Sequence, residues 1–378
     1  MCNEKYNYDR QTDRQTDRQT DRQTDRQTDR QTDRQTELTI SDTKMLQGLS
    51  VLAMVFLHLF DRLDYANLYQ PLLYFKGYPV VFYFAQLSDF CVMGFAFCSG
   101  YALIKLYRQY GRMKYIKSRL KSLFWLLVNF WIILFLFTII SIVIGNGKQI
   151  PGSVLEFMGN FTTVHVTYNG AWWYLFIYIL LVALSPIIFE SFDKMPVTIL
   201  ALCSFFLYVT AYYVRFRMEG HGWLLEKYGT FGMTFFEFII GYLCYRESWI
   251  LKLRKWKDKK SPVVCSALGI ILIVGMLLFH TLVIRSLFIA PVTGMTIIFL
   301  FTLWRKPVWV ERMFMILGRH STNIWLIHMF FYFCIFKNLV FKAKYPLLIL
   351  AFMFWINIVV STGINFVLGK LKRFTKGD

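Results

Sequence analysis

Hydrophobic and polar positions along this chain fall into long alternating blocks. Apolar stretches of about the length that crosses the roughly 30 Å hydrocarbon core of a bilayer recur ten times. They lie at about 46–60, 79–104, 122–144, 171–189, 196–214, 229–245, 262–280, 283–304, 314–336 and 346–369. This pattern predicts an all-α, polytopic integral membrane protein with about ten transmembrane helices.

Composition excludes a soluble domain, because 56% of the 378 residues are hydrophobic and only 17% are charged. The net charge of +19 could suggest nucleic acid, but Lys and Arg gather in four predicted polar segments. These are the loops 105–121, 246–260 and 305–312 and the tail from residue 370. All four share one side of the membrane if the N-terminus is cytoplasmic, as the positive-inside rule requires. We therefore expect both termini in the cytoplasm and no nucleic-acid partner.

One loop opposes this topology, because Lys337, Lys342 and Lys344 would lie on the outer side. The first 44 residues are polar, and the first apolar run is itself a plausible anchor, so no cleavable signal peptide is expected. The seven cysteines are scattered, with no CxxC pair and no metal-ligand spacing. We expect them to be small buried side chains and expect no metal site.

Residues 9–36 spell DRQT seven times and contain no apolar side chain. Such a segment cannot form a core, so residues 1–43 are predicted to be disordered and residues 44–378 to form the transmembrane domain. The codons GAC AGA CAG ACA encode Asp-Arg-Gln-Thr, so a repeated GACA unit gives this peptide in any reading frame. Slippage in such a tract would switch the gene off and on, which predicts phase variation, as in bacterial genes for surface structures. A peptide linker with a chance repeat is the alternative.

His58 lies in the apolar run 48–62. An ionisable group within a membrane helix costs free energy and usually faces a bundle interior or a wet cavity, so a functional role is the first hypothesis. The alternative is a neutral histidine that hydrogen-bonds to a neighbouring helix. Asp89 and Glu237 also lie inside apolar runs, and either could orient an imidazole.

Four stretches together resemble one family. They are "TKMLQGLSVLAMVFLHLF" (43–60), "FCSGYALIKLYRQYGRMKYIKSRLKSLFWLLVNFW" (97–131), "NGAWWYLFIYILLVALSP" (169–186) and "LGRHSTNIWLIHMFF" (317–331). In order and spacing they resemble the membrane acyltransferase 3 family, whose members O-acylate bacterial surface glycans. Residues 44–378 are thereby identified as an acyltransferase 3-like domain. The extracytoplasmic hydrolase-like domain of some members is not expected here.

The resemblance implies a basic residue eleven positions before the histidine of the first helix. Gln47 stands at that position, which is a departure from the family. Lys44 lies one turn earlier and within about 40° of the same helix face. We expect Lys44 to supply the missing charge.

The "SGY" motif, Ser99, Gly100 and Tyr101, ends the second predicted helix. Its glycine could allow close helix packing, or the motif could line a donor tunnel. Nothing like GxSxG surrounds Ser99, so it is not proposed as a nucleophile.

Residues 105–121 hold seven basic residues and no acidic one. Membrane topology explains part of this charge. A cytoplasmic basic rim also suits the phosphates of coenzyme A, and acetyl-CoA or another acyl-CoA is the donor that the family implies. Arg119 aligns with a basic residue of the family before its third helix. Lys114 and Lys117 are further candidates for donor binding, with Lys44.

Trp172 and Trp173 begin the fourth predicted helix on the outer side. Interfacial anchoring explains one of them, and the other could stack on a sugar ring of the substrate. In the ninth helix Ser321 and His328 share a face, whereas Asn323 and His328 do not. We expect Ser321 and Asn323 to make structural hydrogen bonds. His328 is the second catalytic candidate.

Acyl transfer from a thioester to a sugar hydroxyl requires removal of the hydroxyl proton, and a neutral imidazole suits that task. The sequence therefore predicts a bacterial inner-membrane O-acyltransferase with His58 as its catalytic base. The acceptor would be a cell-surface glycan such as lipopolysaccharide, capsule or exopolysaccharide, and the other expected partners are membrane lipids.

Two alternatives stay open. A transporter or flippase would use His58, Asp89 and Glu237 as proton-relay groups, but the internal hydropathy repeats usual in transporters are not found. A structural membrane subunit would leave the charges within the membrane unexplained.

Overall fold

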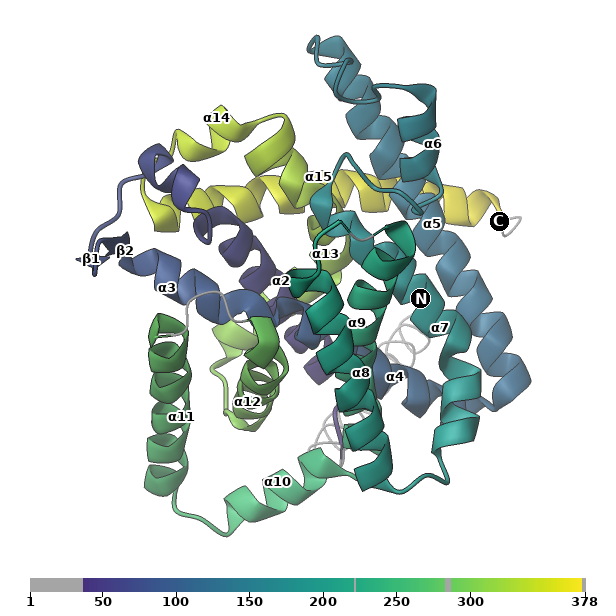
Figure 1. Cartoon of the computed structure of the whole chain (residues 1–378), viewed down its shortest axis with the longest axis vertical. Coiled ribbons are helices and arrows are strands. Elements are labelled where there is room, and N and C mark those ends of the chain that lie inside the picture. The colour runs from purple at the N-terminus through teal and green to yellow at the C-terminus, as the bar shows by residue number, and fades with distance from the viewer. Residues whose placement is uncertain (1–36, 221, 283–286, 376–378) are drawn as a thin grey trace, which may run out of the picture.

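The computed structural model describes residues 37–220, 222–282 and 287–375, and this part of the chain is almost entirely helical (Figure 1). Within it, the strands β1 (Tyr74–Phe75) and β2 (Tyr78–Pro79) form a short antiparallel hairpin. The DRQT repeat, its predicted disorder, the first four residues of the stretch 283–304 and the last three of the basic tail lie outside the described residues.

Each of the ten apolar stretches falls on a helix, so the predicted all-α, polytopic membrane fold is confirmed. The helices are α2 (Ile40–Phe60), α3 (Val80–Leu87) with α4 (Cys91–Tyr110), α5 (Arg112–Val143), α7 (Trp173–Phe192), α8 (Val197–Arg217), α9 (Trp223–Arg246), α11 (Pro262–Leu282), α12 (Ala290–Leu303), α13 (Val308–Met329) and α15 (Pro346–Phe374). In the described chain seven spans are long and apolar enough to cross a membrane, and α9, α12 and α13 complete the bundle.

Short elements join these helices. They are η1 (Leu63–Leu68), η2 (Ser88–Phe90), α6 (Val154–Phe161), η3 (Gly170–Trp172), α10 (Trp249–Asp258), η4 (Leu287–Ile289), the π-helical turn η5 (Phe330–Cys334) and α14 (Lys337–Phe341). α6 and α10 lie at opposite ends of the bundle, at the top and bottom of Figure 1.

Two helices extend beyond the apolar runs that predicted them. α2 begins at Ile40 because Thr39 and Asp42 form a capping box, each side chain accepting a hydrogen bond from the other's backbone N–H. The predicted domain boundary after residue 43 therefore falls inside this helix.

The predicted loop 105–121 is helical on both sides of Gly111, whose φ of +70° makes the turn between α4 and α5. The loop prediction was wrong because Lys and Arg are good helix formers. Two charges of this basic run are paired with the far end of α7: Arg108 lies 2.7 Å from Asp193, and Arg112 lies 2.9 Å from Glu190.

α2 packs against α13 with the two backbones in direct contact. A Cβ atom on Gly48 of α2 would overlap the carbonyl oxygen of Phe314, and a Cβ atom on Gly318 of α13 would overlap the carbonyl oxygen of Lys44. Only glycine permits such an approach, as in other tightly packed membrane helices.

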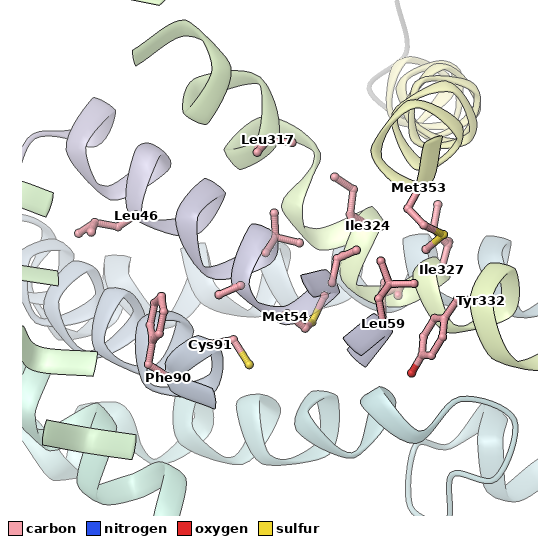
Figure 2. Packing of buried hydrophobic residues seen from close by; sticks show 14 of the residues in the cluster. Leu46, Met54, Leu59, Phe90, Cys91, Leu317, Ile324, Ile327, Tyr332 and Met353 are labelled. Atoms are coloured by element: carbon pink, nitrogen blue, oxygen red, sulfur yellow. The ribbon is translucent and has the colours of Figure 1, made fainter. Parts of the chain in front are cut away.

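Beyond this contact the two helices share an apolar core. Figure 2 shows Met54 and Leu59 of α2 beside Ile324 and Ile327 of α13, with Met353 of α15 next to them. The last turns of α2 and α13 are therefore held together by packing.

The "SGY" motif has a packing role. A Cβ atom on Gly100 of α4 would overlap the Phe238 carbonyl oxygen, and one on Gly241 of α9 would overlap the Phe97 carbonyl oxygen. Ser99 Oγ donates to the Phe95 carbonyl oxygen of its own helix at 2.8 Å. The motif thus fixes α4 against α9.

Six cysteines lie in the described chain, and all are free thiols. Cys91, Cys98 and Cys244 are buried, as predicted, whereas Cys203 is exposed on α8, where the prediction was wrong. The described residues contain no group of three or more His, Cys, Asp or Glu side chains that could hold a metal ion. The expected absence of a metal stays a prediction.

Candidate active site

Two histidines far apart in the sequence meet at the ends of α2 and α13. His58 lies two residues before the end of α2, and His328 is the next-to-last residue of α13. The helices run in the same direction from the Gly48–Gly318 contact, so their last turns are neighbours. His58 Nδ1 lies 2.8 Å from His328 Nε2, which is a hydrogen-bond distance. The sequence pattern indicates both residues but not their contact.

The partners of His328 fix the proton positions in the neutral pair. His328 Nδ1 lies 2.8 Å from the carbonyl oxygen of Trp325 and 3.2 Å from that of Ile324. A carbonyl oxygen only accepts hydrogen bonds, so Nδ1 carries the proton of His328 and Nε2 carries the lone pair. His58 then donates from Nδ1, which leaves the lone pair on its Nε2. An unprotonated nitrogen is what a general base requires.

His58 lines a cavity of about 770 Å³, here called the histidine cavity. Its polar and charged lining includes His58, Asp61, Arg62, Asp64, Gln86, Asp89, Tyr174, Arg215, Thr234 and Glu237. His328 is fully buried behind His58 and does not line the cavity. The geometry therefore makes His58 the residue that could touch a substrate and His328 the residue that orients it.

One ion pair lies beside His58 in the connection that follows α2. Arg62 Nη2 donates to Asp64 Oδ2 at 2.7 Å. This hydrogen bond from the guanidinium holds the pKa of the Asp64 carboxyl below its usual value, so the carboxyl is ionised at neutral pH.

Asp89 and Glu237 line the histidine cavity from two separate elements, η2 and α9. Neither hydrogen-bonds to His58 among the described contacts, so the expectation that an acid orients this imidazole is replaced by the His328 contact. One carboxyl oxygen of each acid has no hydrogen-bond partner in the part of the chain that the structure describes.

The adjacent tryptophans Trp172 and Trp173 have different surroundings. Trp172 is fully buried, its Nε1 donates to the Leu326 carbonyl oxygen at 2.9 Å, and its ring packs edge-on against Phe130. Trp173 lines the histidine cavity, and the Arg215 guanidinium carbon lies 4.9 Å from its ring centroid. Only Trp173 is placed where a sugar could stack.

A second cavity of about 880 Å³, here called the basic cavity, lies toward the end of the bundle that holds the start of α2 and the end of α15. Its lining includes five cationic side chains and no acidic one: Lys44, Lys121, Arg319, Lys372 and Arg373. Such a concentration of one charge suits a ligand with several negative charges.

Asparagines line the basic cavity where α5, α13 and α15 meet. Asn129 Nδ2 donates to Asn323 Oδ1 at 2.6 Å, and Asn323 Nδ2 lies 3.0 Å from both Asn365 Oδ1 and Ser361 Oγ. This agrees with the structural role predicted for Asn323. Ser321 Oγ instead donates to the Gly318 carbonyl oxygen of its own helix at 3.0 Å.

Of the four residues predicted to bind the donor, Lys44 alone lines the basic cavity. Lys114 and Lys117 are exposed on α5, and the Lys114 Nζ lies 5.0 Å from the Tyr110 ring centroid. Arg119 Nη2 donates to Ser118 Oγ at 3.0 Å, and its guanidinium carbon lies 5.9 Å from the Tyr115 ring centroid. These three residues therefore lie on α5 outside the cavity lining.

Four cations of the basic cavity were not singled out as donor-binding residues from the sequence: Lys121, Arg319, Lys372 and Arg373. Arg319 gave the clearest signal, because it is a cation within the quoted stretch 317–331, eleven residues after the start of α13. Its cavity partners come from other helices, and no spacing along the sequence connects them.

Lys44 and Gln47 contact each other. Lys44 Nζ donates to Gln47 Oε1 at 3.0 Å, so the ammonium group lies at the tip of the side chain that replaces the basic residue of the family. This geometry is what a substitution of Lys44 for the missing charge requires.

Comparison with known proteins gives one match. The model of the acyltransferase 3 family, described as an acyltransferase domain, matches residues 43–366. Neither the curated proteins nor the solved structures gave a match to this chain. The family match covers most of the chain and includes both histidines and most of the basic cavity. The chain therefore belongs to the membrane acyltransferase 3 family.

Proposed function

We propose that this protein is a membrane O-acyltransferase that moves an acyl group from acyl-CoA to a hydroxyl group of a bacterial surface glycan. Acetyl-CoA is the first donor to test. The observation that carries the proposal is the His58–His328 pair, which leaves an unprotonated nitrogen of His58 beside the histidine cavity. Family membership makes the protein an acyltransferase and disfavours the transporter alternative.

In the proposed reaction the acceptor hydroxyl gives its proton to His58 Nε2 while its oxygen attacks the thioester carbonyl carbon. The tetrahedral intermediate then collapses, the carbon–sulfur bond breaks, and the departing thiolate takes the proton from His58 Nε2. His58 Nδ1 donates to His328 throughout, and His328 donates to the Trp325 carbonyl oxygen. This chain stabilises the imidazolium that forms between the two proton transfers.

The basic cavity fits the donor. Coenzyme A carries several phosphate charges, and Lys121, Arg319 and Lys372 come from three different helices to line one cavity. α2 contributes to both cavities, with Lys44 in the basic one and His58 in the histidine one. His58 lies 14 positions after Lys44, which corresponds to about 21 Å along the helix. A donor bound by its phosphates would therefore have to extend its thioester along α2 and α13.

The charge distribution supports a cytoplasmic basic cavity and an outward histidine cavity. In that orientation the N- and C-termini face the cytoplasm, where acyl-CoA is available, and the acceptor glycan reaches His58 from outside. The DRQT repeat supports phase variation of this activity in the bacterial inner membrane. Sequencing the GACA tract from single colonies tests that part, since a fixed length with mixed synonymous codons would contradict it.

The test of the reaction is His58→Gln in membranes that receive labelled acetyl-CoA and surface glycan. Glutamine keeps hydrogen-bonding capacity but cannot accept a proton at neutral pH, so acyl incorporation should fall about 10²- to 10⁴-fold. The matched control is His280→Gln, because His280 is another buried histidine, whose Nε2 lies 3.2 Å from Thr293 Oγ1 outside both cavity linings. Near-normal incorporation by His58→Gln at matched abundance would assign the base to another residue.

A further inference from the structure

The lysine-rich loop that opposes the positive-inside rule is joined to the β hairpin. The Lys344 carbonyl oxygen, in the turn after α14, accepts a hydrogen bond from the Gln70 N–H at 2.8 Å. Lys337 Nζ of α14 lies 4.0 Å from the ring centroid of Tyr65 in η1. Figure 1 shows the hairpin and α14 toward its left. These contacts make the two segments one unit of the structure.

Residues 70–79 and 337–348, here called the collar, contain no acidic residue and four lysines: Lys76, Lys337, Lys342 and Lys344. The collar lies at the same end of the bundle as the histidine cavity, because η1, which precedes its first segment, lines that cavity. In the proposed orientation this end faces outward, where the positive-inside rule disfavours lysine. These charges are therefore not explained by membrane topology.

Two collar lysines have backbone conformations that favour glycine or asparagine. The φ angle is +47° at Lys76, in the two-residue turn between β1 and β2, and +61° at Lys344. A left-handed conformation costs free energy at a lysine, and such strain is often found at functional positions. Both side chains and that of Lys342 are exposed, and none of the three is in an ion pair of the described chain. Their charges are available to an external anion.

Exposed apolar and aromatic side chains lie next to these charges in the sequence. They include Leu72, Leu73, Tyr74 and Phe75 in the first segment and Tyr345 and Leu347 in the second. Tyrosine is enriched at membrane–water interfaces, and a lysine there lays its stem along apolar surface while its ammonium group stays in the headgroup layer. This combination matches a phospholipid, which has apolar chains and a charged phosphate.

We propose that the collar is a binding surface for anionic phospholipids of the outer leaflet. Lys76, Lys342 and Lys344 bind the headgroup phosphates, and the exposed apolar side chains contact the acyl chains. Each lysine close to an anionic lipid surface contributes about fivefold to binding. None of the three lysines lines either cavity, so the proposal goes beyond the transferase reaction and is tested without donor or acceptor.

The test is native mass spectrometry of the purified full-length protein in a nonionic detergent. Phosphatidylglycerol, phosphatidylcholine with the same acyl chains, and a polyprenyl diphosphate are added in separate titrations and in competition. The wild-type protein should retain phosphatidylglycerol in preference to the other two lipids. Combined Lys76→Gln, Lys342→Gln and Lys344→Gln should weaken phosphatidylglycerol binding at least about tenfold and leave phosphatidylcholine binding unchanged. Arginine at the same three positions should restore binding, because the charges are kept.

The matched control is Lys148→Gln. Lys148 is exposed in the connection between α5 and α6, outside the collar and both cavity linings, so its variant should bind phosphatidylglycerol as wild type does. Equal retention of phosphatidylglycerol and phosphatidylcholine, or undiminished binding by the triple glutamine variant, would overturn the proposal. Preferential retention of the polyprenyl diphosphate would also overturn it and would assign the collar to a lipid-linked substrate.

Discussion

The histidine cavity and the basic cavity are similar in volume, at about 770 and 880 Å³, but opposite in character. The first is lined by His58 of the histidine pair and by two buried acids, each with one carboxyl oxygen that has no hydrogen-bond partner in the described chain. The second carries five cations and no acid in its described lining. The difference supports our proposal that proton transfer takes place in the first cavity and that the second binds the donor's charge. Substitutions in the two cavities should therefore change different kinetic constants.

The largest effect is expected at the contact between α2 and α13, because α2 contributes residues to both cavities. Gly318→Leu would force α13 away from the Lys44 carbonyl oxygen and so displace residues of both cavities. Because a misplacement of about 1 Å can cost about 10²-fold in rate, acyl transfer should fall at least about 100-fold. Overpacking should also lower the free energy of unfolding by about 1–3 kcal/mol. Transfer rate and melting temperature in detergent are the measurements.

The control for that substitution is Gly363→Leu on α15, where a Cβ atom would meet no neighbouring part of the described chain within 4 Å. This variant should keep its melting temperature and its activity. Equal losses in the two variants would show that the α2–α13 contact is not what couples the cavities.

A smaller effect is expected from His328, because it acts through His58. His328→Leu removes the acceptor for His58 Nδ1 and should lower kcat by about 10- to 100-fold with the donor KM unchanged. His328→Gln should recover most of the rate, since its amide oxygen can accept the same hydrogen bond. If the two variants are equally inactive, His328 does more than orient His58.

Substitutions in the basic cavity should change the affinity for the acyl-CoA donor alone. Arg319→Gln is expected to raise the KM for acyl-CoA about tenfold, with kcat and acceptor KM unchanged, because it removes one charge-assisted contact to phosphate. Lys117→Gln is the control, since Lys117 is exposed on α5 and lies outside the cavity lining. If Lys117→Gln raised the KM for acyl-CoA more than Arg319→Gln did, the donor would bind at the basic run 105–121, as the sequence predicted.

The smallest effect concerns the charge missing at Gln47. Lys44→Ala should raise the donor KM about threefold, the size expected when one partly exposed cation is lost. Adding Gln47→Arg to this variant should restore the donor KM, because the tips of the two side chains lie only 3.0 Å apart. A failure of the second substitution to restore it would separate Lys44 from the role of the family's basic residue.

The bundle could be predicted from the sequence because every membrane helix requires a long apolar run. Helix starts were less predictable, since the basic first turns of α5 and the capping box of α2 are polar and still helical. His58 could be named because an ionisable group in such a run is rare. Its contact with His328 could not, because 270 residues separate them and the contact depends on the Gly48–Gly318 register.

Two further features could not be predicted from the sequence: the different surroundings of Trp172 and Trp173, and the convergence of cations in the basic cavity. Trp172 and Trp173 are neighbours in one motif, yet about 100° of helix rotation puts one in the core and the other on a cavity. The cations of the basic cavity come from α2, α5, α13 and α15, so their convergence is a property of the packed bundle. Donor binding was predicted at residues 105–121 because the basic residues of that segment are close together in the sequence.

The hydrogen-bond chain that orients His58 ends on the backbone carbonyl of Trp325. Many catalytic histidines are oriented by a carboxylate, which a single codon change can remove. A main-chain oxygen is present whatever amino acid occupies position 325, so this last link is protected from substitution as long as α13 stays helical. Among the three residues of this hydrogen-bond chain, a genetic screen should therefore find inactivating substitutions that act through the loss of a side-chain hydrogen bond at positions 58 and 328, and none at position 325.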